Sequence, residues 1–99
     1  MTATGHVDFE SATFKVTTWT IEPGGAIEFH EHEHDYVVIP REGRTMHVVL
    51  GDGSEVVAEM DPSAPYERPK GSAHRCENRS DERIVFTEIE HLGAPIPAV

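Results

Sequence analysis

Three histidines occupy alternate positions within the segment FHEHEHDY, residues 29–36. In a β-strand, residues two apart project from the same face, so His30 and His32 would present their imidazoles side by side. Their Cα atoms would lie about 6.6 Å apart, which allows both rings to reach one metal ion. His34 has the same parity and is a reserve ligand. For this segment alone, a solvated polar strand face is the alternative explanation.

A further histidine lies in the segment PKGSAHRCEN, residues 69–78. This segment has the pattern P-x-G-x-x-H-x-x-x-N, and its named positions are Pro69, Gly71, His74 and Asn78. The pattern resembles the second signature motif of the cupin superfamily, G-x5-P-x-G-x2-H-x3-N. The leading glycine of that motif falls on Ser63 in this chain.

The first cupin motif, G-x5-H-x-H-x3/4-E-x6-G, can be compared with the chain independently of the second. The positions that match it at full spacing are Gly24, His30, His32 and Gly43. Its glutamate position is occupied by Tyr36. Eight of the ten positions of the two motifs are therefore present, in the right order, and the chain is identified as a member of the cupin superfamily.

The resemblance implies an all-β fold, the cupin double-stranded β-helix or jelly-roll barrel of six to eight strands. It also implies that His30, His32 and His74 point into the barrel mouth and bind one divalent transition metal per chain. Iron is the first expectation, and zinc, nickel and manganese are the alternatives, because imidazole suits several of these ions. Three neutral ligands leave the ion its full charge, so a small organic anion is the expected partner.

Tyr36 is the candidate catalytic residue, and three roles are open to it. It can ligate the metal as a phenolate, although a free phenol has a pKa of about 10. It can remain neutral and hydrogen-bond to a substrate, or act as a general base, as tyrosines do in some cupin lyases. It can also serve only for packing. We favour the neutral role beside the metal ligands.

The elements that would position these residues are short and rich in β-branched and aromatic residues, with Gly and Pro between them. Strands are predicted over residues 12–22, 26–34, 35–40, 44–50, 54–60 and 83–92, with a short one within the Pro-rich residues 61–74. The strands over 44–50 and 54–60 are predicted to pair as a hairpin. The tail, residues 93–99, contains Pro95 and Pro97 and is predicted to be irregular. Asn78 is expected to stabilise a turn.

The length, charge balance and cysteine count of the chain limit which classes of function are possible. A chain of 99 residues has room for one core, so we expect a single domain over residues 1–99 with its barrel over about 12–92. The balance of 8 basic and 18 acidic residues argues against nucleic acid as a partner. A lone cysteine, Cys76, excludes an internal disulfide. No apolar run suggests a membrane span or a secretory signal, so we expect a cytoplasmic protein.

Three functions are compatible with these features. The first is a mononuclear three-histidine dioxygenase acting on a small organic anion, because similar sites in this superfamily are associated with thiol and β-diketone dioxygenases. The second is a redox-neutral lyase or isomerase in which Tyr36 moves a proton. The third is a non-catalytic module that binds a small ligand or a metal. We also expect a homodimer, because pairing would cover exposed edge strands.

Overall fold

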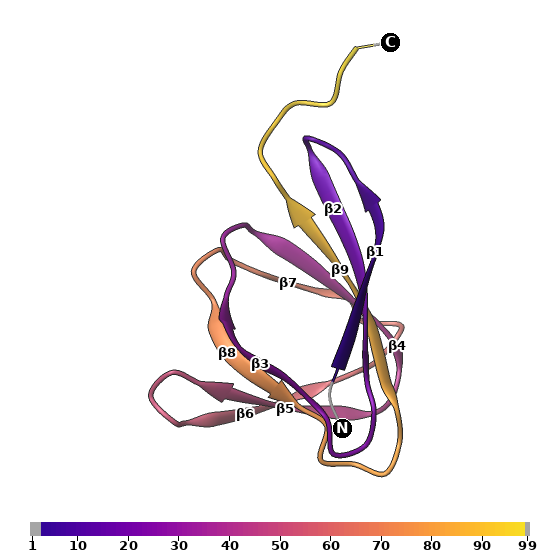
Figure 1. Cartoon of the computed structure of the whole chain (residues 1–99), viewed down its shortest axis with the longest axis vertical. Coiled ribbons are helices and arrows are strands. Elements are labelled where there is room, and N and C mark those ends of the chain that lie inside the picture. Colours follow the sequence, from indigo (N-terminus) through magenta and orange to yellow (C-terminus); the bar gives the residue numbers. More distant parts are fainter. Residues whose placement is uncertain (1–2, 99) are drawn as a thin grey trace.

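The computed structural model describes residues 3–98, and this part of the chain forms nine β-strands and no helix (Figure 1). The strands are β1 (Ala3–Glu10), β2 (Phe14–Ile21), β3 (Ala26–Glu31), β4 (Tyr36–Glu42), β5 (Thr45–Leu50), β6 (Glu55–Glu59), β7 (Tyr66–Arg68), β8 (Ala73–Glu77) and β9 (Ile84–His91). The predicted all-β class is confirmed. No helix of the described residues is long and apolar enough to cross a membrane.

The strands form two antiparallel sheets that face each other (Figure 1). One sheet has the order β1-β2-β9-β4-β7 and the other has the order β3-β8-β5-β6. Both sheets contribute to the buried core, which contains Ile21, Tyr36, Val38, Met46, Met60, Cys76, Ile84 and Phe86. The result is a small barrel in which the space between the sheets is shared by apolar packing and by the candidate site.

Most of the predicted strands are present, including the hairpin of β5 and β6 and the short β7 in the Pro-rich segment. Three differences matter. The strand predicted over residues 26–34 ends at Glu31 as β3, so His32 and His34 lie beyond its end. Residues 3–10 form β1, which lies before the expected barrel start at residue 12. The segment Ala73–Glu77, for which no separate strand was predicted, forms β8, and these two additional strands bring the number from seven to nine.

β1 is an added outer strand that pairs with β2 along its length. Its sequence ATGHVDFE alternates apolar and polar residues, as strands do. Its side chains nevertheless stay largely exposed, and Phe9 is 56% exposed. Gly5 lets the two strands approach closely, because a Cβ there would lie 2.9 Å from the indole ring of Trp19 and the ring would have to shift. Backbone pairing and this close approach to Trp19 therefore hold β1, while burial contributes little.

The buried side chain of Asn78 links the ends of two strands through hydrogen bonds. Its side chain is 1% exposed, and its Nδ2 donates hydrogen bonds to the carbonyl oxygens of Ile21 (2.8 Å) and Glu82 (2.7 Å). Its Oδ1 accepts from the backbone N–H of Ser80 at 3.0 Å and from the hydroxyl of Ser80 at 2.6 Å. The predicted role of Asn78 in stabilising a turn is confirmed, and the turn it holds leads into β9.

Replacing Asn78 by alanine should lower the free energy of unfolding by about 2–3 kcal/mol, because buried carbonyl groups would lose their donors. Urea denaturation followed by circular dichroism measures this change. Ser63→Ala is the control, since Ser63 is exposed and bonds only within its own turn to Asp61. The control should change stability by no more than about 0.5 kcal/mol. Equal effects of the two substitutions would contradict this stabilising role of Asn78.

Candidate metal centre

Three imidazoles converge inside the barrel. His30 belongs to β3, His32 follows directly after β3, and His74 belongs to β8. Their ring centroids lie 4.7 Å apart for His30 and His32, 4.9 Å for His30 and His74, and 5.2 Å for His32 and His74. One nitrogen atom from each ring lies within 4.8 Å of the other two, so the cluster can hold a metal ion. The structure thus brings together all three histidines that the sequence singles out as metal ligands.

A β-bulge in β3 turns His30 inward. Ile27 is paired with Cys76, and His30 is paired with His74, so a step of three residues on β3 opposes a step of two on β8. In a regular strand Ile27 and His30 would face opposite sides. The bulge places both on the side of the barrel interior, with Ile27 packed against the core. In a regularly alternating strand, the hydrophobic residues and the histidines would lie on different faces, and only one set could face the interior. The bulge allows members of both sets to face it.

His32 is positioned by a neighbouring turn, because β3 ends before it. Its backbone N–H donates to the carbonyl oxygen of Ser72, and its carbonyl oxygen accepts from the N–H of Gly71, both at 2.8 Å. Gly71 has a φ of 90°, a backbone conformation that favours glycine. The regular alternation of side chains along a strand, which was expected to place His30, His32 and His34 on one face, therefore does not extend to His32 and His34. His34 is half-buried and lies outside the three-histidine cluster.

A hydrogen bond from His30 determines which of its two ring nitrogens carries the proton, and it leaves the other nitrogen free to bind a metal. Its Nδ1 lies 2.7 Å from the carbonyl oxygen of Glu28, which can only accept, so Nδ1 carries the proton. In the neutral ring this leaves the lone pair on Nε2, directed at the other histidines. The Nε2 atoms of His30 and His32 are 3.0 Å apart. Two nitrogens bound to one ion at about 2.1 Å and at right angles would have about this separation.

Burial keeps the rings of His32 and His74 neutral. Burial, with smaller contributions from His30 and His74, lowers the pKa of His32 to about 4. Burial, followed by the charges of His30 and Arg68, lowers the pKa of His74 to about 4. Neutral imidazole is the form that binds metal, and iron, zinc, nickel and copper all accept it. The donor set therefore fits a divalent transition metal ion.

Tyr36 packs flat against one of these rings. Its ring is stacked on that of His32, with centroids 3.9 Å apart and planes inclined by 18°, and the residue is 3% exposed. Burial, reinforced by the negative charge of Glu88, raises the pKa of Tyr36 well above its usual value. The phenol is therefore protonated at neutral pH. It offers the site an O–H group and an aromatic face, and it carries no negative charge.

An interior cavity of about 470 Å³ reaches the cluster at His74. Its walls are mainly apolar and include Val38, Met46, Val48, Val57 and Phe86. Its polar lining includes Tyr36, Tyr66, Ser72 and Glu88. Arg68 is the one lysine or arginine among the lining residues, and its guanidinium lies 4.9 Å from the centroid of the Tyr66 ring. Such a cavity suits a small molecule with an apolar body and an anionic group.

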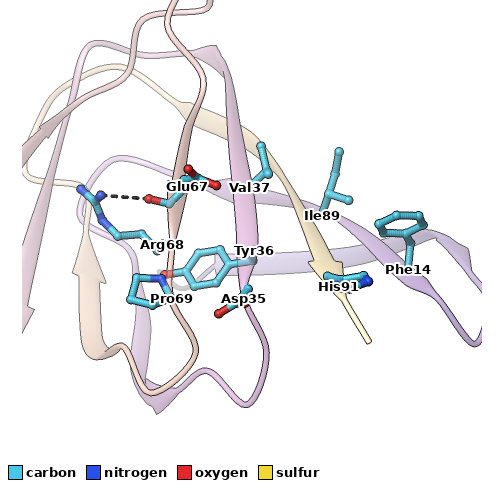
Figure 2. A pocket seen from close by; sticks show the side chains of 9 residues that line it. All are labelled: Phe14, Asp35, Tyr36, Val37, Glu67, Arg68, Pro69, Ile89 and His91. Atoms are coloured by element: carbon cyan, nitrogen blue, oxygen red, sulfur yellow. Dashed lines mark hydrogen bonds between the residues drawn. The ribbon is translucent and has the colours of Figure 1, made fainter. Parts of the chain in front are cut away.

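Arg68 stands at the rim of this cavity. It also lines a second hollow, which Tyr36 and Pro69 share and which extends to Phe14 and His91 (Figure 2). Its guanidinium donates a hydrogen bond to the carbonyl oxygen of Glu67 at 3.0 Å (Figure 2). None of the three clustered histidines lines this second hollow. Arg68 is exposed, so its side chain is accessible to solvent while it lines the interior cavity.

On another side, the cluster borders an acidic groove between β3 and the first two strands. Its charged lining includes Glu10, Lys15, Glu28, Glu31, Glu33, Glu88 and Glu90. His30, His32 and His34 line the same groove. The excess of carboxylates makes this opening attractive to cations.

Glu88 is the residue of the site that the sequence analysis missed. It lies in β9, is 8% exposed, and lines both the interior cavity and the acidic groove. Its Oε1 accepts a hydrogen bond from the indole N–H of Trp19 at 3.1 Å, and its Oε2 lies 3.9 Å from Nε2 of His32. Burial raises the pKa of its carboxyl to about 7. The sequence did contain one signal for it. Glu88 lies two residues after the core residue Phe86 in a strand, so both side chains project from the same face.

Comparisons with known proteins agree with this fold. No family model matches the chain. The beta-alanine degradation protein BauB of Pseudomonas aeruginosa is 33% identical over 84 residues, which cover 85% of this chain and 87% of BauB. The crystal structure of a cupin domain from Bordetella pertussis Tohama I is 35% identical, with a TM-score of 0.85 over 90% of this chain and 92% of that domain.

A more distant solved structure is the polyketide cyclase RemF of Streptomyces resistomycificus. It has a TM-score of 0.74 at 21% identity, covering 95% of this chain and 68% of RemF. At this identity the likeness concerns the fold alone.

His30→Ala should abolish stoichiometric metal binding, because one of the three converging nitrogens is removed. His34→Ala is the matched control, since it removes a neighbouring imidazole that lies outside the cluster, and it should bind metal like the unaltered chain. Elemental analysis of the untagged proteins measures the metal, and circular dichroism checks the fold. Retention of metal by His30→Ala, or its loss from His34→Ala, would contradict the assignment.

Proposed function

The chain belongs to the cupin superfamily, and we propose that it is a mononuclear metal-dependent dioxygenase acting on a small organic anion. The observation that carries the proposal is the convergence of three imidazoles at the end of a largely apolar cavity. Neutral ligands leave the charge of a divalent ion uncompensated by the ligands themselves, which favours the binding of an anion. Iron is the proposed metal, held by His30, His32 and His74.

Arg68 and Tyr36 are the residues proposed to orient the substrate. Arg68 supplies a guanidinium at the cavity rim, where it can bind a carboxylate through two parallel hydrogen bonds. Tyr36 supplies a protonated phenol that can donate a hydrogen bond to the same molecule. The name of the relative BauB refers to degradation of beta-alanine, a small amino acid, which supports a substrate of this size that bears a carboxylate group.

The apolar walls have a role in the same reaction. Bound iron would supply electron transfer to dioxygen, with both oxygen atoms entering the organic product. Val38, Met46 and Phe86 would exclude water from the anchored substrate. Exclusion of water strengthens the attraction between the anion and Arg68. The chain therefore provides an anchor, a hydrogen-bond donor and a dry enclosure.

The chain loaded anaerobically with Fe²⁺ should consume oxygen when one of a panel of small anions is added. The panel comprises β-alanine, thiol-bearing carboxylates and β-diketones, and an oxygen electrode measures uptake. Zinc-loaded protein should consume none, because zinc has no redox chemistry. Arg68→Gln should lower kcat/KM at least about tenfold, as expected for loss of a charged hydrogen bond. Arg79→Gln, on the exposed surface, should not. Absence of uptake with the whole panel would count against a dioxygenase.

A redox-neutral lyase or isomerase is the second candidate, and the buried, protonated Tyr36 on the cavity wall favours it. Tyr36→Phe separates the two, because the substitution keeps the ring stacked on His32 and removes only the hydroxyl. For a dioxygenase we expect kcat to fall less than about tenfold. A fall of about 100-fold or more, with activity supported equally by zinc, would instead assign proton transfer to Tyr36.

A further inference from the structure

One buried carboxylate in the barrel lacks a positive partner. Glu88 faces the interior from the middle of β9, opposite Val38 of β4 and Thr17 of β2. Among residues 3–98, no lysine or arginine forms an ion pair with it. The nearest charged side chain on its own strand is Glu90, which is also acidic. Carboxylates removed from water are found paired with a cation or coordinated to a metal, because isolated burial is costly.

The contacts of Glu88 show where such a cation would lie. The Oε1 atom is occupied by the indole N–H of Trp19, and the Oε2 atom is on the side of His32, 3.9 Å from its Nε2. Two donor atoms bound to one ion at about 2.1 Å are separated by at most about 4.2 Å. The 3.9 Å between Oε2 and Nε2 of His32 therefore allows an ion held by the histidines to lie close to Oε2. The other groups around the carboxylate, among them Tyr36, Tyr66 and Cys76, are uncharged at neutral pH.

We propose that Glu88 is the acidic residue of the metal centre and supplies, from β9, the negative charge that is absent at position 36. The proposal rests on the metal site of the preceding subsection. His30, His32 and His74 form the group of donors within 4.8 Å, and Glu88 stands beside that group next to His32. Its charge offsets part of the charge of the ion. It thereby raises the affinity of the site for divalent cations.

Trp19 is the positioning residue for this carboxylate. Its indole N–H fixes Oε1, which leaves Oε2 as the oxygen nearest the histidines. The indole in turn lies against Gly5 of β1, where any Cβ would approach it to 2.9 Å. The outer strand β1 thus supports the ring that orients Glu88. Trp19→Phe keeps an aromatic side chain at this position and removes the N–H donor, together with part of the ring that lies against Gly5.

The test is the affinity of the metal-free chain for Zn²⁺, measured by competition with a chromophoric chelator. Glu88→Gln preserves the size of the side chain and an acceptor for Trp19, and should weaken zinc binding about 10- to 100-fold, the usual effect of altering a group beside metal ligands. Glu90→Gln is the matched control, since it removes the same charge from the same face of the same strand. The control should change affinity less than about threefold.

Melting temperatures of the metal-free proteins separate this role from a purely structural one. Without metal, Glu88→Gln should melt at or above the temperature of the unaltered chain, because it removes an unpaired buried charge, and the rise on adding zinc should be smaller in the variant. Trp19→Phe should weaken zinc binding in the same direction and by a smaller factor.

Equal zinc affinity of Glu88→Gln and the unaltered chain would overturn the role of Glu88 and leave the three-histidine site intact. Equal weakening by Glu88→Gln and Glu90→Gln would also overturn it, because the effect would then be one of general charge. An unaltered chain that binds no zinc and no iron would instead overturn the metal site itself, and with it the proposed function.

Discussion

The site depends on the antiparallel pairing of β3 with β8, and in particular on the additional residue that β3 accommodates between Ile27 and His30. That bulge lets one strand give both an aliphatic side chain to the core and an imidazole to the centre. It also sets His30 directly across the ladder from His74, so two of the three candidate ligands are held by backbone hydrogen bonds. The third, His32, takes its position from the turn that carries Gly71 and Ser72.

The electrostatic character of the interior follows from burial. The imidazoles of His32 and His74 are kept neutral, and the phenol of Tyr36 keeps its proton. Positive charge is supplied at the rim by Arg68, while the opposite opening is lined largely with carboxylates. The centre therefore lies between a side that suits anions and a side that suits cations. A divalent ion and an organic anion can each be attracted from a different direction.

The sequence predicted most of the strands and the three clustered histidines better than it predicted their geometry. Pairs of motifs with fixed spacing identified His30, His32 and His74, and runs of β-branched residues identified β2, β4, β5 and β9. The bulge was not predictable, because it is a property of two paired strands and not of β3 alone. Glu88 was missed for a similar reason: its approach to His32 arises only when distant segments fold together. The alternation in β1 was present in the sequence, but little of that strand is buried.

The two hydrogen bonds between His32 and the turn at residues 71–72 join a ligand of one motif to the glycine of the other. Although the motifs are separated along the chain, neither can change its backbone without moving the other. The two motifs are therefore mechanically coupled, and a substitution that relaxes the turn should also displace His32. Tyr36 is coupled to the same region of the backbone by its pairing with Arg68, which directly precedes that turn.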